Sequence, residues 1–112
     1  MICRIWHGWT SLANAAPYER LLREDIFVGI VERHIPGFRG IQLLRREGPD
    51  EVEFVTTMWF EDLDAVRAFA GAEYERAVVP EPARALLARF DERSAHYEVR
   101  ETRGQAGGKG TA

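Results

Sequence analysis

The chain has 112 residues, which is the length of one domain with a single modest core. Its apolar fraction of 46% and charged fraction of 29% are typical of a soluble globular protein. The net charge of −3, without a basic stripe, argues against nucleic-acid binding. No apolar run reaches the roughly 20 residues that a membrane-spanning helix needs.

The N-terminal region and the cysteine content both bear on location. Cys3 is the single cysteine and has no partner for an internal disulfide, which favours a reducing compartment. The first ten residues, MICRIWHGWT, lack the hydrophobic core of a signal peptide. We therefore expect a cytoplasmic protein that binds neither a membrane nor nucleic acid.

The first third of the chain predicts a strand followed by a long helix. Residues 2–10 are rich in aromatic and β-branched side chains and predict a strand whose two faces are both largely apolar. Asn14 is a candidate cap for a helix that runs to about Arg33, with Gly29 as a point where it could bend. Its apolar stripe consists of Tyr18, Leu22, Ile26 and Ile30.

The middle of the chain predicts two strands and a short helix. Residues 38–47 form the second strand, and Gly48-Pro49-Asp50 makes the turn. In the third strand, 51–60, the even positions are largely apolar, while the odd positions run from acidic to aromatic. Asp62 caps the helix that follows, which presents Leu63, Val66 and Phe69 on one side.

The last third predicts shorter elements. Residues 74–79 suggest one more helical turn, 83–90 a helix, and 94–101 the final strand. The segment 103–112 is rich in glycine and has too little apolar surface to offset its chain entropy, so we expect it to be disordered. The chain is thus divided into one domain, 1–102, and a flexible tail, 103–112.

The order strand, helix, strand, strand, helix, strand predicts an α+β fold of the ferredoxin-like type with an antiparallel sheet. Helices in this fold cover one face of the sheet. Because the first and third strands also place apolar groups on the other face, we expect a homodimer in which two sheets enclose a barrel.

Two segments resemble the antibiotic biosynthesis monooxygenase family of dimeric α+β barrel proteins. These are PGFRGI at 36–41 and DEVEFVTTMWFEDLDAVRAFAGAEYERAV at 50–78. In that family the strand often ends in Trp and is followed by an amphipathic helix with an aromatic residue or His near its end. The similarity, which includes the strand order and the long first helix, covers about residues 1–101.

The resemblance implies oxidation of polycyclic phenols or hydroquinones by molecular oxygen, without metal or flavin. The deprotonated substrate would itself reduce oxygen, while the protein supplies a dry pocket, a base and hydrogen-bond donors. It also suggests Trp59, Phe69 and Tyr74 as walls of a pocket for a small aromatic molecule.

A second branch of the family binds and degrades haem with an Asn, a Trp and a downstream His. This chain has His7, Phe69 and Val78 at the corresponding positions. Val78 cannot bind iron, so the resemblance implies no cofactor, with haem as the alternative.

Two histidines are candidates for catalysis. His7 lies near the end of the first strand and His96 near the start of the last, and these strands are expected to be antiparallel neighbours. The two side chains would then lie opposite each other or one step apart, either as a base with a helper or as a structural polar pair. His34 ends the first helix, where a cation suits the helix dipole.

The remaining candidates each have a structural alternative. Trp6, Trp9 and Trp59 suit a core or an interface as well as a pocket. Arg4 would either bind an anionic substrate or pair with Glu53 or Glu98 across the sheet. His7, His96 and Glu98 lack the spacing of a metal site, so none is predicted.

Overall fold

The computed structural model describes residues 1–104, and most of the tail predicted for 103–112 lies outside the described residues. Five antiparallel strands form one sheet, in which β2 and β3 lie to one side of the central strand β1 and β4 and β5 both pair with β1. The strands are β1 Ile2–Ser11, β2 Phe38–Glu47, β3 Glu51–Phe60, β4 Leu87–Phe90 and β5 Ala95–Glu98. The predicted α+β, ferredoxin-like fold with an antiparallel sheet is confirmed.

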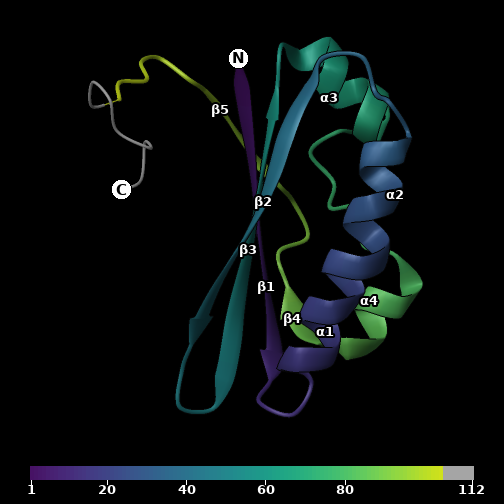
Figure 1. The fold of residues 1–112 in the computed structure, drawn as a ribbon, viewed down its shortest axis with the longest axis vertical. Helices are drawn as coiled ribbons and strands as arrows, with labels where there is room; N and C mark the ends of the chain where they lie inside the picture. The colour runs from purple at the N-terminus through teal and green to yellow at the C-terminus, as the bar shows by residue number, and fades with distance from the viewer. Residues whose placement is uncertain (105–112) are drawn as a thin grey trace.

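The long helix consists of three consecutive pieces that cross one face of the sheet (Figure 1). They are α1 Ala15–Leu21, the π-helical turn η1 Leu22–Ile26, and α2 Phe27–Glu32. The irregularity therefore lies at residues 22–26 rather than at Gly29. Asn14 does not cap the helix as predicted, because its Nδ2 donates instead to the carbonyl of Leu86 at 3.2 Å.

The core lies between this face of the sheet and the helices. Tyr18 of α1 packs edge-on against Phe54 of β3, with the ring centroids 4.9 Å apart. Phe60 lies 5.7 Å from Phe38 and 5.8 Å from Phe69, measured between ring centroids. Phe54 and Phe60 are fully buried, as the apolar even positions of β3 predicted.

The second helix, α3 Leu63–Ala70, begins as predicted. The Asp62 carboxylate accepts a hydrogen bond from the backbone N–H of Ala65 at 2.9 Å. Val66 and Phe69 are buried on the side that faces the sheet. The cap thus fixes where β3 ends and where the helix that carries Phe69 starts.

The chain after α3 differs from the prediction. Residues 74–79 do not form a helical turn; Arg76 instead makes an isolated antiparallel bridge with Arg93. The helix predicted at 83–90 is split into α4 Glu81–Leu86 and strand β4, because residues 87–90 pair with β1. The final strand, predicted at 94–101, is limited to β5. Long-range pairing with β1 decided these elements, and local sequence does not encode it.

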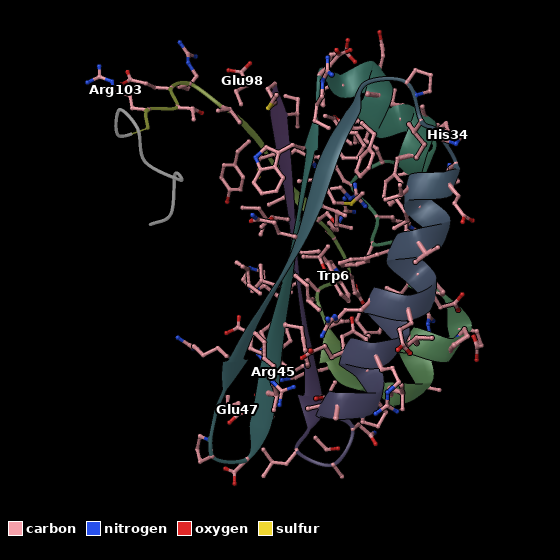
Figure 2. All side chains as sticks on the ribbon, in the orientation of Figure 1. Trp6, His34, Arg45, Glu47, Glu98 and Arg103 are labelled. Carbon is pink, nitrogen blue, oxygen red and sulfur yellow. The ribbon has the colours of Figure 1, made fainter. Side chains whose placement is uncertain are left out.

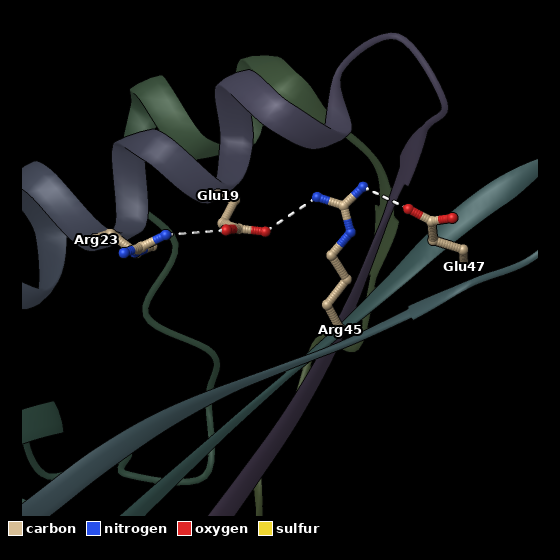
Figure 3. A network of polar contacts seen from close by, with 4 residues as sticks. All are labelled: Glu19, Arg23, Arg45 and Glu47. Carbon is tan, nitrogen blue, oxygen red and sulfur yellow. Dashed lines mark hydrogen bonds and ion pairs between the residues drawn. The ribbon is translucent and has the colours of Figure 1, made fainter.

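A surface network links α1 to β2 (Figure 3). Arg45 donates to Glu19 at 3.0 Å and to Glu47 at 2.9 Å, while Arg23 donates to Glu19 at 3.3 Å. The hydrogen bond from Arg45 lowers the pKa of Glu19. Arg45 also lies over the Phe54 ring, with its guanidinium 5.6 Å from the centroid. Because exposed ion pairs contribute little, we regard this network as fixing orientation rather than supplying stability.

The opposite face of the sheet carries no helix (Figure 1). We call it the open face. Leu44 is 49% exposed and Tyr97 is 57% exposed on this face. Among residues 1–104, no helix is long and apolar enough to cross a membrane.

We expect Asp62→Ala to lower the free energy of unfolding by about 1 kcal/mol, the usual value of a helix N-cap. Urea unfolding followed by circular dichroism measures this change. Asp64→Ala is the matched control, because Asp64 is exposed and, among the described residues, pairs only with Arg67, at 3.0 Å. Equal losses in the two variants would contradict a capping role for Asp62.

Candidate active site

A cavity lies between the helix-covered face of the sheet and the long helix. Its floor is formed by side chains of β1, β2 and β3: Arg4, Trp6, Ile41, Thr56 and Met58. Figure 2 shows Trp6 in the layer of side chains between the sheet and the helices. The Trp6 ring lies over Gly8, where an added Cβ would come within 2.9 Å of the ring. Gly8 therefore leaves the space that the indole occupies.

The roof of the cavity comes from the long helix and includes its π-helical turn: Tyr18, Leu22, Ile26, Phe27 and Ile30. π-Helical turns are rare and occur frequently at functional sites. Phe69 of α3 and residues 78–80 close the sides. The volume open to the centre of a water molecule is about 60 Å³. This space holds a few waters, since one water needs roughly 10–15 Å³ on this measure. An aromatic ligand is larger than this space, so it enters only when the side chains that line the cavity move apart.

Among residues 1–104, Arg4 is the one charged residue that lines this apolar cavity, and it is almost fully buried, at 3% exposure. Its Nη1 donates to the carbonyl oxygen of Tyr74 at 2.5 Å, and its Nη2 donates to the carbonyl oxygen of Arg76 at 3.1 Å. The guanidinium also lies over the Phe69 ring, 5.4 Å from the centroid. Burial lowers the pKa of Arg4 to about 10, so the side chain remains a cation at neutral pH.

His96 is the third polar partner of Arg4. Its Nε2 lies 2.9 Å from Arg4 Nη1. Since a guanidinium can only donate, Nε2 accepts and the imidazole proton is on Nδ1. Burial and, second, the Arg4 cation lower the pKa of His96. His96 is therefore neutral at pH 7, and its Nε2 lone pair is engaged by Arg4.

The placement predicted for the two histidines is wrong. His96 is paired with Arg4 in the β1–β5 register, and the two side chains share the helix-covered face. His7 lies on the open face, where its Nδ1 is 2.9 Å from Glu53 and its ring is stacked with Trp9 at 6.0 Å. The odd positions of β1 point away from the helices because side chains alternate along a strand. The catalytic roles of His7 and His96 remain predictions, but the two residues cannot act together in one cavity.

The three aromatic residues predicted for the pocket do not lie together in the structure. Trp59 is paired with Cys3 and lies on the open face, next to the buried Phe60, which points the other way. Phe69 lines the cavity. Tyr74 stands beside it: its ring packs edge-on against His96, with the centroids 5.1 Å apart, and its carbonyl oxygen accepts from Arg4.

The donor set of the cavity does not fit a histidine-ligated haem. Within the described part of the chain, its lining residues include no histidine, cysteine or carboxylate, and Val78 lies on its wall. Burial raises the pKa of Tyr18, which disfavours a tyrosinate ligand. In residues 1–104, no three His, Cys, Asp or Glu side chains are grouped as they would be to hold a metal ion.

The sequence allowed two roles for Arg4, binding of an anionic substrate or pairing with Glu53 or Glu98, and the structure shows no such pairing within residues 1–104. Glu53 instead contacts His7 on the open face, while Glu98 contacts Arg100 at 3.3 Å. The useful signal was strand parity, because Arg4 has the parity of Trp6 and Gly8, opposite to that of His7.

We expect the His96 imidazole to titrate below its ordinary pKa of 6.5, as followed by NMR. In the window below 6.5, the unfolded chain binds more protons than the folded chain, so stability falls as pH falls and levels off below the folded pKa. Urea unfolding between pH 4.5 and 8 should show that His96→Gln loses this part of the pH dependence. His34→Asn is the control, since Asn tolerates the φ of 50° at this exposed position. Titration of His96 above 6.5 would contradict the geometry.

Comparison with known proteins found similarity at the level of structure. No family model and no curated protein sequence matches the chain. A putative antibiotic biosynthesis monooxygenase from Bacillus cereus superposes with a TM-score of 0.65 at 14% identity, covering 93% of this chain and 97% of that protein. SnoaB, a cofactor-independent oxygenase from Streptomyces nogalater, gives a TM-score of 0.58 at 23% identity, covering 90% and 95% of the two chains.

A third similar structure is a haem-binding protein. The haem degrader MhuD from Mycobacterium tuberculosis, solved with two haems in its active site, gives a TM-score of 0.54 at 25% identity. The alignment covers 93% of this chain and all of MhuD. The predicted resemblance is thus confirmed, and the chain has the fold of the antibiotic biosynthesis monooxygenase family.

Proposed function

We propose that the chain is a monooxygenase-like enzyme that oxidises an aromatic phenol or quinol with molecular oxygen, without a cofactor. The observation that carries this proposal is the apolar cavity with one buried cation, Arg4, in its wall. The structural similarity to an oxygenase that is described as cofactor-independent supports it.

The geometry suits a reaction in which the substrate supplies the electrons. An ionised phenol is electron-rich enough to reduce oxygen, and a site that excludes water strengthens every charge interaction within it. For an anthrone, one oxygen atom binds to the methylene carbon and converts it into a second carbonyl group. The other oxygen atom leaves as water with the two methylene hydrogens, so no external reductant is needed. The apolar walls shield the ionised intermediate, and the cation stabilises its negative charge.

We also propose that the chain works as a homodimer joined through the open face. Ile5, Val55 and Trp59 are only partly buried there, and Leu44 and Tyr97 are exposed. The Thr57 hydroxyl on the same face is buried and has no hydrogen-bond partner within residues 1–104. A second sheet packed against this face would cover the apolar groups, which are a solubility liability in a monomer.

We expect the purified, chelator-treated protein to consume oxygen when a panel of anthrones and hydroquinones is added. Uptake that saturates with substrate and exceeds autoxidation supports the proposal, and product analysis should show one oxygen atom incorporated. Absence of uptake with every member of the panel, in a folded protein, contradicts it. His7→Ala serves to locate the chemistry: because His7 faces away from the cavity, turnover should be retained, whereas its loss would place the reaction at the open face.

The second candidate function is binding of haem or another small ligand without catalysis. Its support is the structural similarity to MhuD, whose structure contains haem. Haem titration followed by visible absorbance distinguishes it, because a specific axial ligand gives a sharp, saturable Soret band. The lack of histidine and cysteine in the cavity lining predicts only weak, unsaturated changes.

For the dimer, we expect Val55→Glu to shift the protein from dimer to monomer in sedimentation velocity. Val55 lies between His7 and Leu44 in the sheet, so a carboxylate there would lose its water in the interface, next to the Glu53 carboxylate that already contacts His7. Val28→Glu is the matched control, since Val28 is 45% exposed on the helical layer. A wild-type monomer, or a dimer unaffected by Val55→Glu, would contradict the interface.

A further inference from the structure

We propose that Arg4 is the anion-binding residue of the cavity and that it holds the phenolic oxygen of the ligand as a phenolate. This inference rests on the proposed function, which supplies the ligand class, an aromatic phenol, and a stabilising role for the buried cation. The binding of an anion at Arg4 follows from the structure of this chain.

Arg4 is a buried charge without an ionic partner. It takes part in no ion pair among the described residues, and all three of its hydrogen-bond acceptors are neutral: two backbone carbonyls and the His96 imidazole. Buried arginines are almost always paired with a carboxylate or another anion. The missing counter-charge in an apolar cavity therefore points to an anionic ligand.

The hydrogen-bond count of Arg4 leaves room for this anion. A guanidinium has five N–H hydrogens. Both hydrogens on Nη1 are used, by Tyr74 and His96, and one on Nη2 is used by Arg76. The hydrogens that remain are the one on Nε and the second on Nη2, and neither has an acceptor among residues 1–104.

None of the charged and titratable groups described around Arg4 supplies its missing negative counter-charge. His96 of β5 is neutral and accepts from Arg4, and Arg33 of α2 lies over the same Phe69 ring, with its guanidinium 5.5 Å from the centroid. Glu75 acts on His96 from the surface and pairs with Arg93 at 3.8 Å. The net charge close to the cavity is therefore positive.

Two physical effects on the ligand have opposite signs, which makes the proposal testable. Transfer of a phenol into an apolar cavity raises its pKa, because burial disfavours the charged form. A cation within about 4–6 Å lowers the pKa by about 1–3 units. If Arg4 contacts the phenolic oxygen, the second effect should prevail and the bound phenol should ionise more readily than in water.

The probe is 2-naphthol, whose near-ultraviolet absorption band moves to longer wavelength on ionisation. We expect its pKa to fall by one unit or more when it binds to the wild-type protein. Arg4→Met should abolish this decrease, while binding of 2-methoxynaphthalene, which cannot ionise, is retained. Arg33→Met is the matched control and should behave as wild type, because Arg33 contacts the same ring and, within residues 1–104, donates only to the carbonyls of Ala68 and Phe69.

Several results would overturn the proposal. They are an unchanged or raised pKa in the wild type, failure of 2-naphthol to bind, and a lowered pKa that persists in Arg4→Met. If Arg4→Met does not fold, the wild type alone gives the answer: its affinity for 2-naphthol must rise at least tenfold with pH through the ionisation, while that for 2-methoxynaphthalene stays constant. Oxygen uptake is measured separately. A lowered pKa without oxygen uptake would contradict the oxygenase function but not anion binding at Arg4. Oxygen uptake without a lowered pKa would contradict anion binding at Arg4 but not the oxygenase function.

Discussion

The alternation of side chains along β1 divides this molecule into two environments. The central strand pairs with three other strands, so each of its residues is committed to one face of the sheet. Arg4 and Trp6 lie beneath the helices, whereas His7 and Trp9 lie on the open face. A shift of one residue in register would exchange the two sets completely. The location of the candidate site and that of the proposed interface therefore depend on the same pairing.

Arg4 connects this pairing to the irregular segment after α3. A buried cation is costly unless its donors are satisfied, and residues 74 and 76 supply carbonyl oxygens at that point. These contacts explain why residues 74–79 adopt an extended path with a bridge at Arg76 instead of a helical turn. The same path brings residues 78–80 to the side of the cavity. The Arg4 side chain thus fixes the path of the segment that forms one wall of the cavity, and it also gives the cavity a positive charge.

The fold could be predicted from the sequence because the patterns that determine its main strands and helices extend over only a few residues. The alternation in β3 and the cap at Asp62 act over a few residues, and the structure confirms both. The errors occurred where distant pairing decides: residues 87–90 form a strand only because β1 is available to them. The placement of the histidines failed for the same reason, since the register that pairs His96 with Arg4 is a long-range property of β1 and β5. Of the five residues proposed for the site, Phe69 lines the cavity and Tyr74 and His96 adjoin it through Arg4.

Within residues 1–104, the cavity lining contains no carboxylate or histidine, so the proposed reaction needs another explanation for the deprotonation of its substrate. A general base accelerates proton removal, but a fixed cation can achieve ionisation by stabilising the anion that remains. Lowering a phenol's pKa by about 1–3 units brings it close to neutrality, where water or buffer accepts the proton. His96 helps indirectly: as a neutral acceptor it orients Arg4 without cancelling its charge, which a carboxylate at the same place would do. The arrangement of a neutral orienting group behind an unpaired cation is therefore what makes an apolar cavity suitable for an ionised aromatic ligand.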